Sequence, residues 1–309
     1  MHIALYTHSR LPVEGYGGTQ RVVVWLARGL AELGHRVTLL APMGSRVPGT
    51  ELVPLDPAEI LQAGFDLTPL IPASAEILHA HGPLRVPSGR PHVFTLHGNF
   101  HPEKSPPPNT IFVSADHARR HGGTAFVYNG VDPSEFVFRS EKADYDLFLG
   151  RLHTIKGYRW AIQGAKRSGR PIVVAGGWRP SLSRRVRFVG RVDGDQKAAL
   201  LAGARCLWMP ALWDEPFGLT LVEAMMSGTP VLGTRRGALP EVVSDEVGAL
   251  GDTLDELVAL RPSIGHRDPH ACRRRAERWF SHTVMAQEYV RMYQHYLTTS
   301  ELPSGKRIP

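Results

Sequence analysis

The sequence predicts an α/β fold of two doubly wound domains, each with its own parallel sheet. Short apolar runs alternate with helical patterns along the chain, which is the order of parallel strands joined by crossover helices. The chain has 309 residues, enough for two cores of ordinary size. Its 42% apolar and 21% charged residues are typical of a soluble globular protein.

The first half opens with a predicted strand over residues 2–7 and a glycine-rich stretch over residues 14–19. Apolar residues at helical spacing then predict a helix over residues 20–33. Further strands are expected at residues 36–41, 77–81, 92–97, 110–114 and 125–128, with a short helix at residues 115–121. Residues 42–75 are rich in proline and glycine, and their weak periodicity places no element.

Gly17 and Gly18 close the glycine-rich stretch, just before the first helix. Glycines at the mouth of a helix let the backbone approach a phosphate. The stretch is not Gly-x-Gly-x-x-Gly, and the second strand closes with Ala41 and Pro42 instead of an acidic residue. We therefore expect a phosphate-facing loop but no NAD site.

The second half repeats the same alternation. Strands are expected at residues 145–150, 171–175, 186–190 and 206–210, and helices at residues 158–168, 195–204, 219–227 and 269–296. The last of these segments has an apolar side formed by aromatic residues and methionine, namely Trp279, Phe280, Tyr289, Met292, Tyr293 and Tyr296.

The mouth of the helix at residues 219–227 is the strongest candidate site. Gly218 precedes this helix, Glu215 stands just before it, and Glu223 lies inside it. The first N–H groups of a helix lack intrahelical partners, and the helix dipole adds about half a positive charge there, so this mouth favours an anion. Carboxylates on both flanks suit hydroxyl groups instead. The pattern indicates a ligand with hydroxyls on both sides of its phosphates, as in a nucleotide sugar.

This stretch resembles the signature of the family-4 retaining glycosyltransferases, which have the GT-B fold. The resemblance is carried by the Glu-x7-Glu spacing and the residues between the two glutamates, namely Glu215, Pro216, Phe217, Gly218, Leu219, Thr220 and Glu223. It implies two Rossmann-like domains that face a central cleft. The acceptor-side domain is expected at residues 1–138, completed by a helix at about 284–299 that crosses back, and the nucleotide-sugar domain at residues 139–283.

Four other segments also resemble this family. Gly150-Arg151-Leu152 followed by Lys156-Gly157 is similar to its Gly-Arg-Leu…Lys-Gly motif. Gly17-Gly18 is similar to its loop facing the donor diphosphate and the acceptor, and the Asn-Gly-Val-Asp turn at residues 129–132 to its exit from the first domain. Thr95-Leu96-His97-Gly98 is similar to the segment whose histidine contacts the donor sugar.

The resemblance implies a role for each matching residue. Arg151 and Lys156 would stabilise the leaving diphosphate, together with N–H groups near Gly218. Glu215 would hold the sugar hydroxyls and Glu223 the ribose, while His97 would contact the far edge of the sugar. The remaining donor-binding residues would be Gly17, Gly18, Phe217, Leu219 and Thr220.

The implied activity is transfer of a sugar, most simply from a UDP-sugar, to a sugar or glycolipid acceptor with retention of configuration. It implies front-face attack, with no metal and no cofactor beyond the nucleotide sugar. Two alternatives stay open at this point. One is a hydrolase or epimerase of the same fold that acts on nucleotide sugars, and the other is a non-catalytic binder of nucleotide sugars.

Several residue pairs invite a metal-site interpretation that the sequence does not favour. Asp144 with Asp146, and Asp193 with Asp195, form Asp-x-Asp sequences, but the first pair leads into a strand and the second stands at a helix cap. His79 and His81 share one strand face without an evident third ligand. We expect these residues to be structural.

The charge of the chain is uneven. The net charge is +7, and residues 141–309 supply the excess with 25 basic against 18 acidic residues. The basic residues are scattered without interleaved aromatics, so nucleic acid is not the expected partner.

No apolar run is long enough to span a membrane, and the start reads as a strand instead of a signal peptide. Two cysteines give no disulfide framework, so we expect a cytoplasmic protein. Peripheral contact of the C-terminal helix with the inner face of a membrane stays open.

Overall fold

The computed structural model describes residues 1–13, 15, 17–62, 65–83, 89–101 and 105–309. Its contacts divide the chain into two compact units. Unit 1 comprises Met1–Asp132 and Ser281–Pro309, and unit 2 comprises Pro133–Phe280. Each unit has its own sheet.

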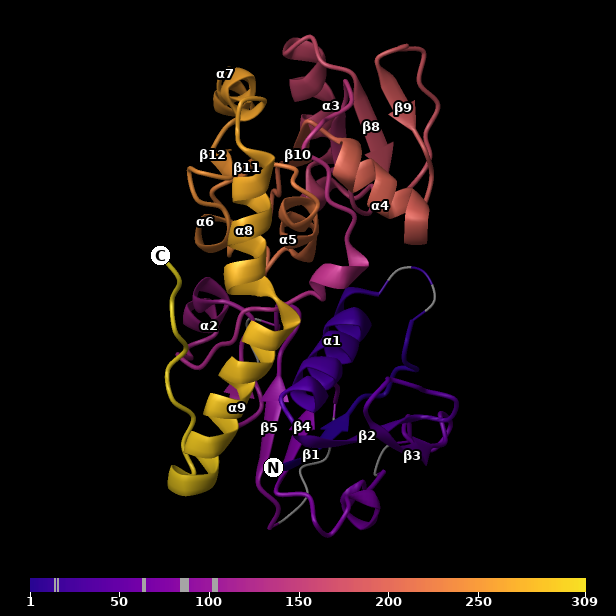
Figure 1. Ribbon diagram of the computed structural model, residues 1–309, viewed down its shortest axis with the longest axis vertical. Coiled ribbons are helices and arrows are strands. Elements are labelled where there is room, and N and C mark those ends of the chain that lie inside the picture. Colours follow the sequence, from indigo (N-terminus) through magenta and orange to yellow (C-terminus); the bar gives the residue numbers. More distant parts are fainter. Residues whose placement is uncertain (14, 16, 63–64, 84–88, 102–104) are drawn as a thin grey trace. The chain divides into compact units, whose positions relative to one another are not determined.

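Unit 1 contains a parallel sheet of six strands in the order β3-β2-β1-β4-β5-β6 (Figure 1). In its centre, Ile3 of β1 lies between Val37 of β2 and Ile77 of β4, and all three are buried. The strands are β1 (His2–Tyr6), β2 (Arg36–Pro42), β3 (Glu51–Leu55), β4 (Ile77–Ala80), β5 (His92–Thr95) and β6 (Thr110–Ile111). The helices of this unit are α1 (Gly18–Glu32), α2 (Ala115–Arg120) and α9 (His282–Thr299).

Two sequence predictions in unit 1 were wrong or incomplete. The segment over residues 42–75, which the sequence left unassigned, contains the edge strand β3. Only one of the five residues of β3 is buried, so the strand lacks an apolar signal. The strand expected over residues 125–128 is reduced to a single bridge between Phe112 and Phe126.

The C-terminal helix α9 packs against α1, as predicted for a helix that crosses back to the first domain. Ser281 caps it by accepting a hydrogen bond from the N–H of Val284. Its apolar side, with Tyr289, Met292 and Tyr293, is buried inside unit 1. This side of α9 is therefore covered by protein and is not presented to a membrane.

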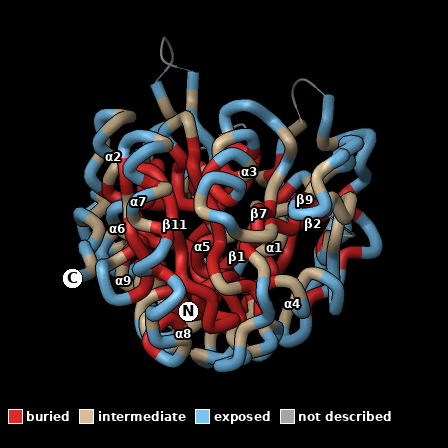
Figure 2. Tube along the Cα trace, turned by 90° about the horizontal axis from the view of Figure 1, so that it is seen from above, coloured by how far each residue is buried: buried red, intermediate tan, exposed pale blue. Residues whose placement is uncertain are grey.

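Unit 2 contains a second parallel sheet, in the order β12-β11-β10-β7-β8-β9. Its strands are β7 (Asp146–Leu149), β8 (Ile172–Ala175), β9 (Val186–Phe188), β10 (Cys206–Met209), β11 (Val231–Thr234) and β12 (Gly248–Gly251). Its helices are α3 (Tyr158–Arg167), α4 (Gly194–Gly203), α5 (Leu219–Met226), α6 (Leu239–Val242), α7 (Leu254–Ile264) and α8 (Pro269–Phe280). Figure 2 shows the central strands, such as β7 and β11, as buried tubes and the outer turns of many helices as exposed.

Both sheets have the same connectivity. Counted within each unit, the strand order is 3-2-1-4-5-6, which is the order of a doubly wound Rossmann-type sheet. The order in which successive strands are added to the sheet changes direction between β1 and β4 in unit 1, and between β7 and β10 in unit 2. Loops that follow the strands at such a switch point diverge and leave room for a ligand. The predicted fold class is confirmed.

The basic run on α8 is used inside unit 2. Arg273 donates to the carbonyl oxygens of Pro133 and Met226, and Arg275 donates to that of Val242. Arg274 pairs with Asp268. These contacts tie α8 to its neighbours. Within the described part of the chain, none of the helices combines the length and the apolar character needed to cross a membrane.

Candidate functional site

The loops after β7 and β10 bring together two of the predicted motifs of unit 2. The N–H of Leu212, after β10, donates to the carbonyl of Ile155, after β7, at 2.8 Å. A Cβ at Gly157 would overlap the carbonyl oxygen of Pro210, so only glycine permits this approach. The two strands are neighbours at the switch point, which explains why these loops meet.

Lys156 and Glu215 form an ion pair at this point. The Lys156 Nζ lies 2.6 Å from Glu215 Oε2, and the side chains are 15% and 11% exposed. Trp213 Nε1 donates to the same carboxylate oxygen at 2.9 Å, and its ring lies 4.6 Å from the lysine nitrogen. Glu215 Oε1 has no hydrogen-bond partner among the described residues. One oxygen is thus anchored while the other is left to accept from a ligand.

The backbone of Glu215 is held from a different direction. Its carbonyl accepts from the N–H of Ala238 at 2.9 Å. A Cβ at Gly237 would overlap both the backbone nitrogen and the backbone oxygen of Glu215. Gly237 also has a φ of +59°, a conformation that other residues rarely adopt. The loop after β11 therefore supports Glu215 directly.

The mouth of α5 has the geometry that its sequence predicts. Gly218 is the N-cap residue and has a φ of +88°. Leu219 and Thr220 open the helix and are half-buried. Phe217 is buried and packs edge-on against Phe280, with the ring centres 5.8 Å apart. The side chain of Phe217 is a core group, so any contact of this residue with a ligand would come from its backbone.

Glu223 lies inside α5 and is almost fully buried. Its Oε1 lies 2.6 Å from the Nζ of Lys197 on α4, and the two side chains are 5% and 14% exposed. A buried carboxylate needs such a partner, because an unpaired charge would be costly to desolvate. A ribose bound by Glu223 would share this carboxylate with Lys197.

Arg151 follows β7 and is exposed, in the same loop as Lys156. Of the two Asp-x-Asp sequences, the first has a structural role in the fold. Asp146 is buried and accepts from Trp208 Nε1 at 2.8 Å and from Arg261 Nε at 2.7 Å. Asp193 stands at the N-cap position of α4 as predicted, but its side chain makes no capping hydrogen bond there.

In unit 1, Gly17 and Gly18 lie at the start of α1, after β1. Glu14 and Tyr16, from the same predicted loop, lie outside the described residues. A Cβ at Gly17 would lie 2.8 Å from Gln20 Oε1 and from Val13 Cγ1. The glycine therefore allows a tight entry into α1.

His97 follows β5, is partly exposed, and contacts a row of two buried histidines, His81 and His79. Its Nε2 shares a hydrogen bond of 3.0 Å with Nδ1 of His81, which follows β4. The ring of His81 lies 4.0 Å from that of His79. His79 contacts the hydroxyls of Tyr293 at 2.6 Å and Thr95 at 2.7 Å. Burial lowers the pKa of His97 to about 4 and holds those of His79 and His81 well below the usual value.

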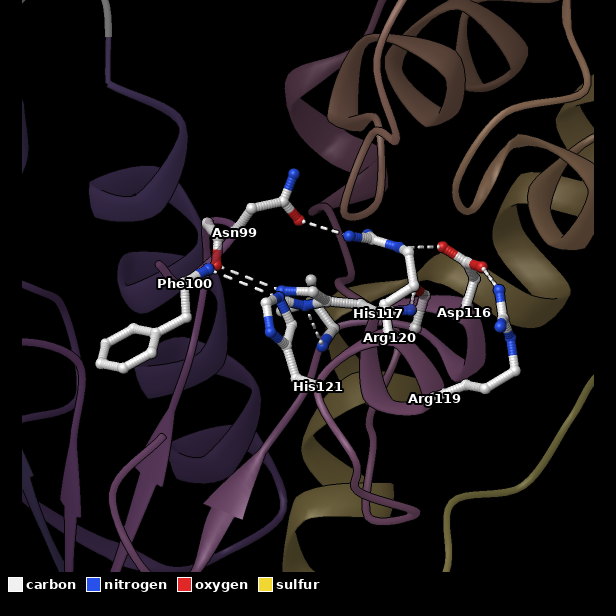
Figure 3. A network of polar contacts seen from close by, with 10 residues as sticks. Asn99, Phe100, Asp116, His117, Arg119, Arg120 and His121 are labelled. Atoms are coloured by element: carbon white, nitrogen blue, oxygen red, sulfur yellow. Dashed lines mark hydrogen bonds and ion pairs between the residues drawn. The ribbon is translucent and has the colours of Figure 1, made fainter. Parts of the chain in front are cut away.

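Helix α2 holds the loop that follows His97 (Figure 3). Arg120 donates from Nη1 to the side-chain oxygen of Asn99 at 3.0 Å. The N–H of Phe100 donates to His121 Nε2 at 3.4 Å, and His117 Nε2 lies 3.1 Å from the carbonyl oxygen of Gly98. Three side chains of one short segment thus fix three consecutive residues of the loop.

The sequence did not predict several residues that contact Glu215 and Glu223 in unit 2 or His97 in unit 1. Trp213 and Lys197 carry no motif, and nothing in the sequence connects them to Glu215 or Glu223. Gly237 could have been suspected, since it follows a strand and two arginines, but its target is a backbone 22 positions away, and only the fold identifies it. His81 was expected to be structural, and nothing in the sequence indicates that its contact is with His97.

Two Rossmann-type units of this strand order are the architecture of the GT-B glycosyltransferases. Comparison with known proteins agrees. The model described as "Glycosyltransferase Family 4" matches residues 16–127, and that of "Glycosyl transferases group 1" matches residues 144–259. The chain belongs to the family-4 glycosyltransferases.

A solved structure covers nearly the whole chain. AviGT4, a glycosyltransferase involved in avilamycin A biosynthesis, is 30% identical with a TM-score of 0.80, and the match covers 96% of this chain and 98% of that one. Anabaena HepE, solved in complex with UDP-glucose, is 17% identical with a TM-score of 0.66 over 96% of this chain and 100% of that one, and shows the fold alone.

Among curated proteins, the phosphatidyl-myo-inositol mannosyltransferase of Mycobacterium leprae is 36% identical over 126 residues, or 38% of this chain and 34% of that protein. The enzyme of the same name from Propionibacterium freudenreichii is 26% identical over 306 residues, and the match covers 77% of this chain and 78% of that protein. The matches to the first three curated relatives span only 39%, 34% and 54% of those proteins.

Proposed function

We propose that this chain transfers a sugar from a nucleotide diphosphate sugar to an acceptor hydroxyl, with retained anomeric configuration and without a metal ion. The ion pair of Lys156 with Glu215 carries this proposal. The pair offers a cation for the phosphates and an open carboxylate oxygen for the sugar, the two halves of such a donor.

Lys156 would stabilise the leaving group. An ammonium has three N–H donors, and Glu215 accepts only one of them. Negative charge grows on the β-phosphate as the glycosidic bond breaks, so a cation fixed beside it lowers the barrier. Arg151, in the same loop, would supply the second cation, and the N–H groups at the mouth of α5 would complete the phosphate site.

The proposed step is front-face substitution. The bond from the anomeric carbon to the phosphate oxygen breaks, and the acceptor oxygen bonds to that carbon on the same face. The acceptor proton passes to the departing phosphate. Glu215 Oε1 and His97 would hold sugar hydroxyls, and Glu223 would hold the ribose.

We propose a UDP-sugar as donor and a sugar or glycolipid as acceptor. The crystallised HepE complex contains UDP-glucose, and two relatives are named for transfer of mannose to phosphatidyl-myo-inositol. A nucleotide-activated glucose or mannose would offer the hydroxyls and phosphates that Glu223, Glu215 and Lys156 are proposed to contact.

The test begins with UDP-, GDP- and ADP-sugars, ranked by how far each raises the melting temperature. The donor that ranks first is then turned over in EDTA with sugar acceptors, and NMR reads the anomeric configuration of the product. Retained configuration with activity in EDTA is expected. Free sugar as the only product would indicate hydrolysis, and an inverted product or a need for Mn²⁺ would contradict the mechanism.

Lys156→Ala should lower kcat about 10²–10³-fold with a smaller effect on KM, because the lost interaction strengthens in the transition state. Lys166→Ala, which removes an exposed lysine from α3, is the matched control and should leave kcat unchanged. Equal kcat values for the two variants would remove Lys156 from the mechanism.

A further inference from the structure

The row of histidines in unit 1 leaves one ring nitrogen accessible to a ligand. Nε2 of His97 is engaged by His81. Nδ1 of His97 has no hydrogen-bond partner among the described residues, and it is not one of their fully buried unpaired atoms. Nδ1 is therefore the nitrogen with which His97 can meet a substrate hydroxyl.

Neighbouring side chains hold the ring of His81 in a fixed orientation. It is 4% exposed, and its ring lies against that of His79. His79 is itself held through both nitrogens by Tyr293 and Thr95, and Thr95 in turn contacts the hydroxyl of Tyr289 at 2.9 Å. Side chains of β4, β5 and α9 thus fix the orientation of His81, and through it that of His97.

The two histidines also control each other's tautomer. A neutral imidazole has one N–H and one lone pair, so in the shared hydrogen bond one ring must donate and the other accept. If His81 donates, Nδ1 of His97 carries the proton, and if His97 donates, Nδ1 carries the lone pair. Nε2 of His81 is buried without a hydrogen-bond partner, so no third group competes for this choice within the described residues.

We propose that His81 is a positioning residue that fixes the ring orientation and the tautomer of His97, so that Nδ1 of His97 meets the donor sugar. The part that concerns the sugar rests on the proposed function, whereas the control of the tautomer stands on the geometry alone. Burial keeps both rings neutral at neutral pH, which the coupling requires.

The first experiment needs no ligand. Two-bond ¹H–¹⁵N correlation spectra of the ¹⁵N-histidine-labelled protein report which ring nitrogen carries the proton. The signals of His97 are assigned by their loss in His97→Ala. We expect a single tautomer of His97 in the native protein and a mixed or reversed tautomer in His81→Phe. A mixed tautomer in the native protein, or the same single tautomer in both, would overturn the proposal.

The second experiment compares amide variants. The amide nitrogen of asparagine can occupy the place of Nδ1, and that of glutamine the place of Nε2. His81→Asn should therefore retain kcat/KM within about threefold, whereas His81→Gln should lose about tenfold, the value of one hydrogen bond. By the same geometry, His97→Asn should lose less than His97→Gln. The reverse order in either pair contradicts the proposal.

His92, at the start of β5, is the matched control position. His92→Asn and His92→Gln should both keep the native kcat/KM and the native tautomer of His97. The two proposals can fail separately. If His97→Ala is inactive while His81→Phe leaves both tautomer and turnover unchanged, only the role of His81 falls. If every His97 variant is fully active, the sugar contact in the proposed function falls, and the spectra still decide the tautomer.

Discussion

At the scale of single residues, the site is an arrangement of anchored charges. Lys156 and Glu215 are 59 positions apart in the chain but share a hydrogen bond. Trp213 shields the pair and donates to the same carboxylate oxygen. Because both anchors converge on Oε2, Oε1 is held in a defined direction without being used. Such a fixed acceptor needs no reorganisation when a hydroxyl arrives.

This asymmetry of Glu215 gives a testable separation of ligands. If Glu215 holds the sugar as proposed, Glu215→Ala should leave the affinity for UDP within about twofold, because the proposed phosphate contact is with Lys156. It should weaken binding of the intact nucleotide sugar by about 1–3 kcal/mol through the lost hydroxyl contacts. Calorimetry with both ligands measures the difference. Glu223→Gln is the control, since a lost ribose contact weakens both ligands equally. If Glu215→Ala weakens binding of UDP and of the nucleotide sugar equally, Glu215 does not hold the sugar.

The residues of this candidate site could be named from the sequence only where they carry motifs. Glu215, Glu223, Arg151 and Lys156 could be named because their spacing resembles a known signature. Their partners could not, because the contacts of Lys197 and Trp213 arise from packing between elements. His97 was named from its segment, but the sequence gives no sign that His81 contacts it.

At the scale of elements, loops that lack any motif hold the motif residues in place. The loop after β11 supports Glu215 through Gly237 and Ala238, and α2 supports the loop after His97. A small displacement of either support moves a site residue. Misplacement of a reacting group by about 1 Å can cost about 10²-fold in rate.

Gly237→Ala tests this support. The added methyl group would push against the backbone of Glu215, so we expect kcat/KM to fall by about 10²-fold. Gly190→Ala is the matched control, because Gly190 has a similar φ of +76° but open space around it. Both variants incur about 1–2 kcal/mol of backbone strain. A similar loss of activity in both would show that strain, and not contact with Glu215, is responsible.

Buried histidines give unit 1 a defined response to pH. Burial lowers the pKa of His97 to about 4 and that of His117 to about 3, against about 6.5 in an exposed chain. Between pH 6.5 and 4, the unfolded chain binds protons that the folded chain does not. The free energy of unfolding therefore falls as the pH falls through this window, by up to about 1.4 kcal/mol per pH unit for each histidine.

Urea unfolding at intervals from pH 7.5 to 4.5 measures this slope. His117→Gln should reduce it by up to one proton, because glutamine does not titrate. Stability that rises as the pH falls, or an equal slope in the native protein and the variant, would contradict the assignment of a buried neutral ring to His117.

The fold itself was largely predictable because strand–helix alternation is a strong pattern. Most central strands and the helices α1, α2, α3, α4 and α5 fall within a few residues of their predicted ranges. The edge strand β3 could not be predicted, because its mostly unburied residues have no apolar signal. The failed strand at residues 125–128 shows the opposite case, in which buried apolar residues make only a bridge.

At the scale of the whole molecule, the chain leaves unit 1 and later returns to it. Asp132 and Ser281 bound an insertion that forms all of unit 2. The two segments of unit 1 meet where the insertion begins and ends. Val131 pairs with Ser281, and its carbonyl oxygen accepts a hydrogen bond from the N–H of His282 at 2.9 Å. Unit 1 thus depends on a helix that is synthesised after all of unit 2.

This connectivity predicts which parts fold alone. Residues 133–280 form one continuous unit and should fold independently, as judged by a cooperative thermal transition. Residues 1–132 alone should not, because loss of α9 uncovers the buried face of α1 and leaves His79 without Tyr293. Joining residue 132 directly to residue 281 should restore folding, since these ends already lie together. A cooperative transition for residues 1–132 alone, equal to that of the joined chain, would show that α9 is dispensable for unit 1.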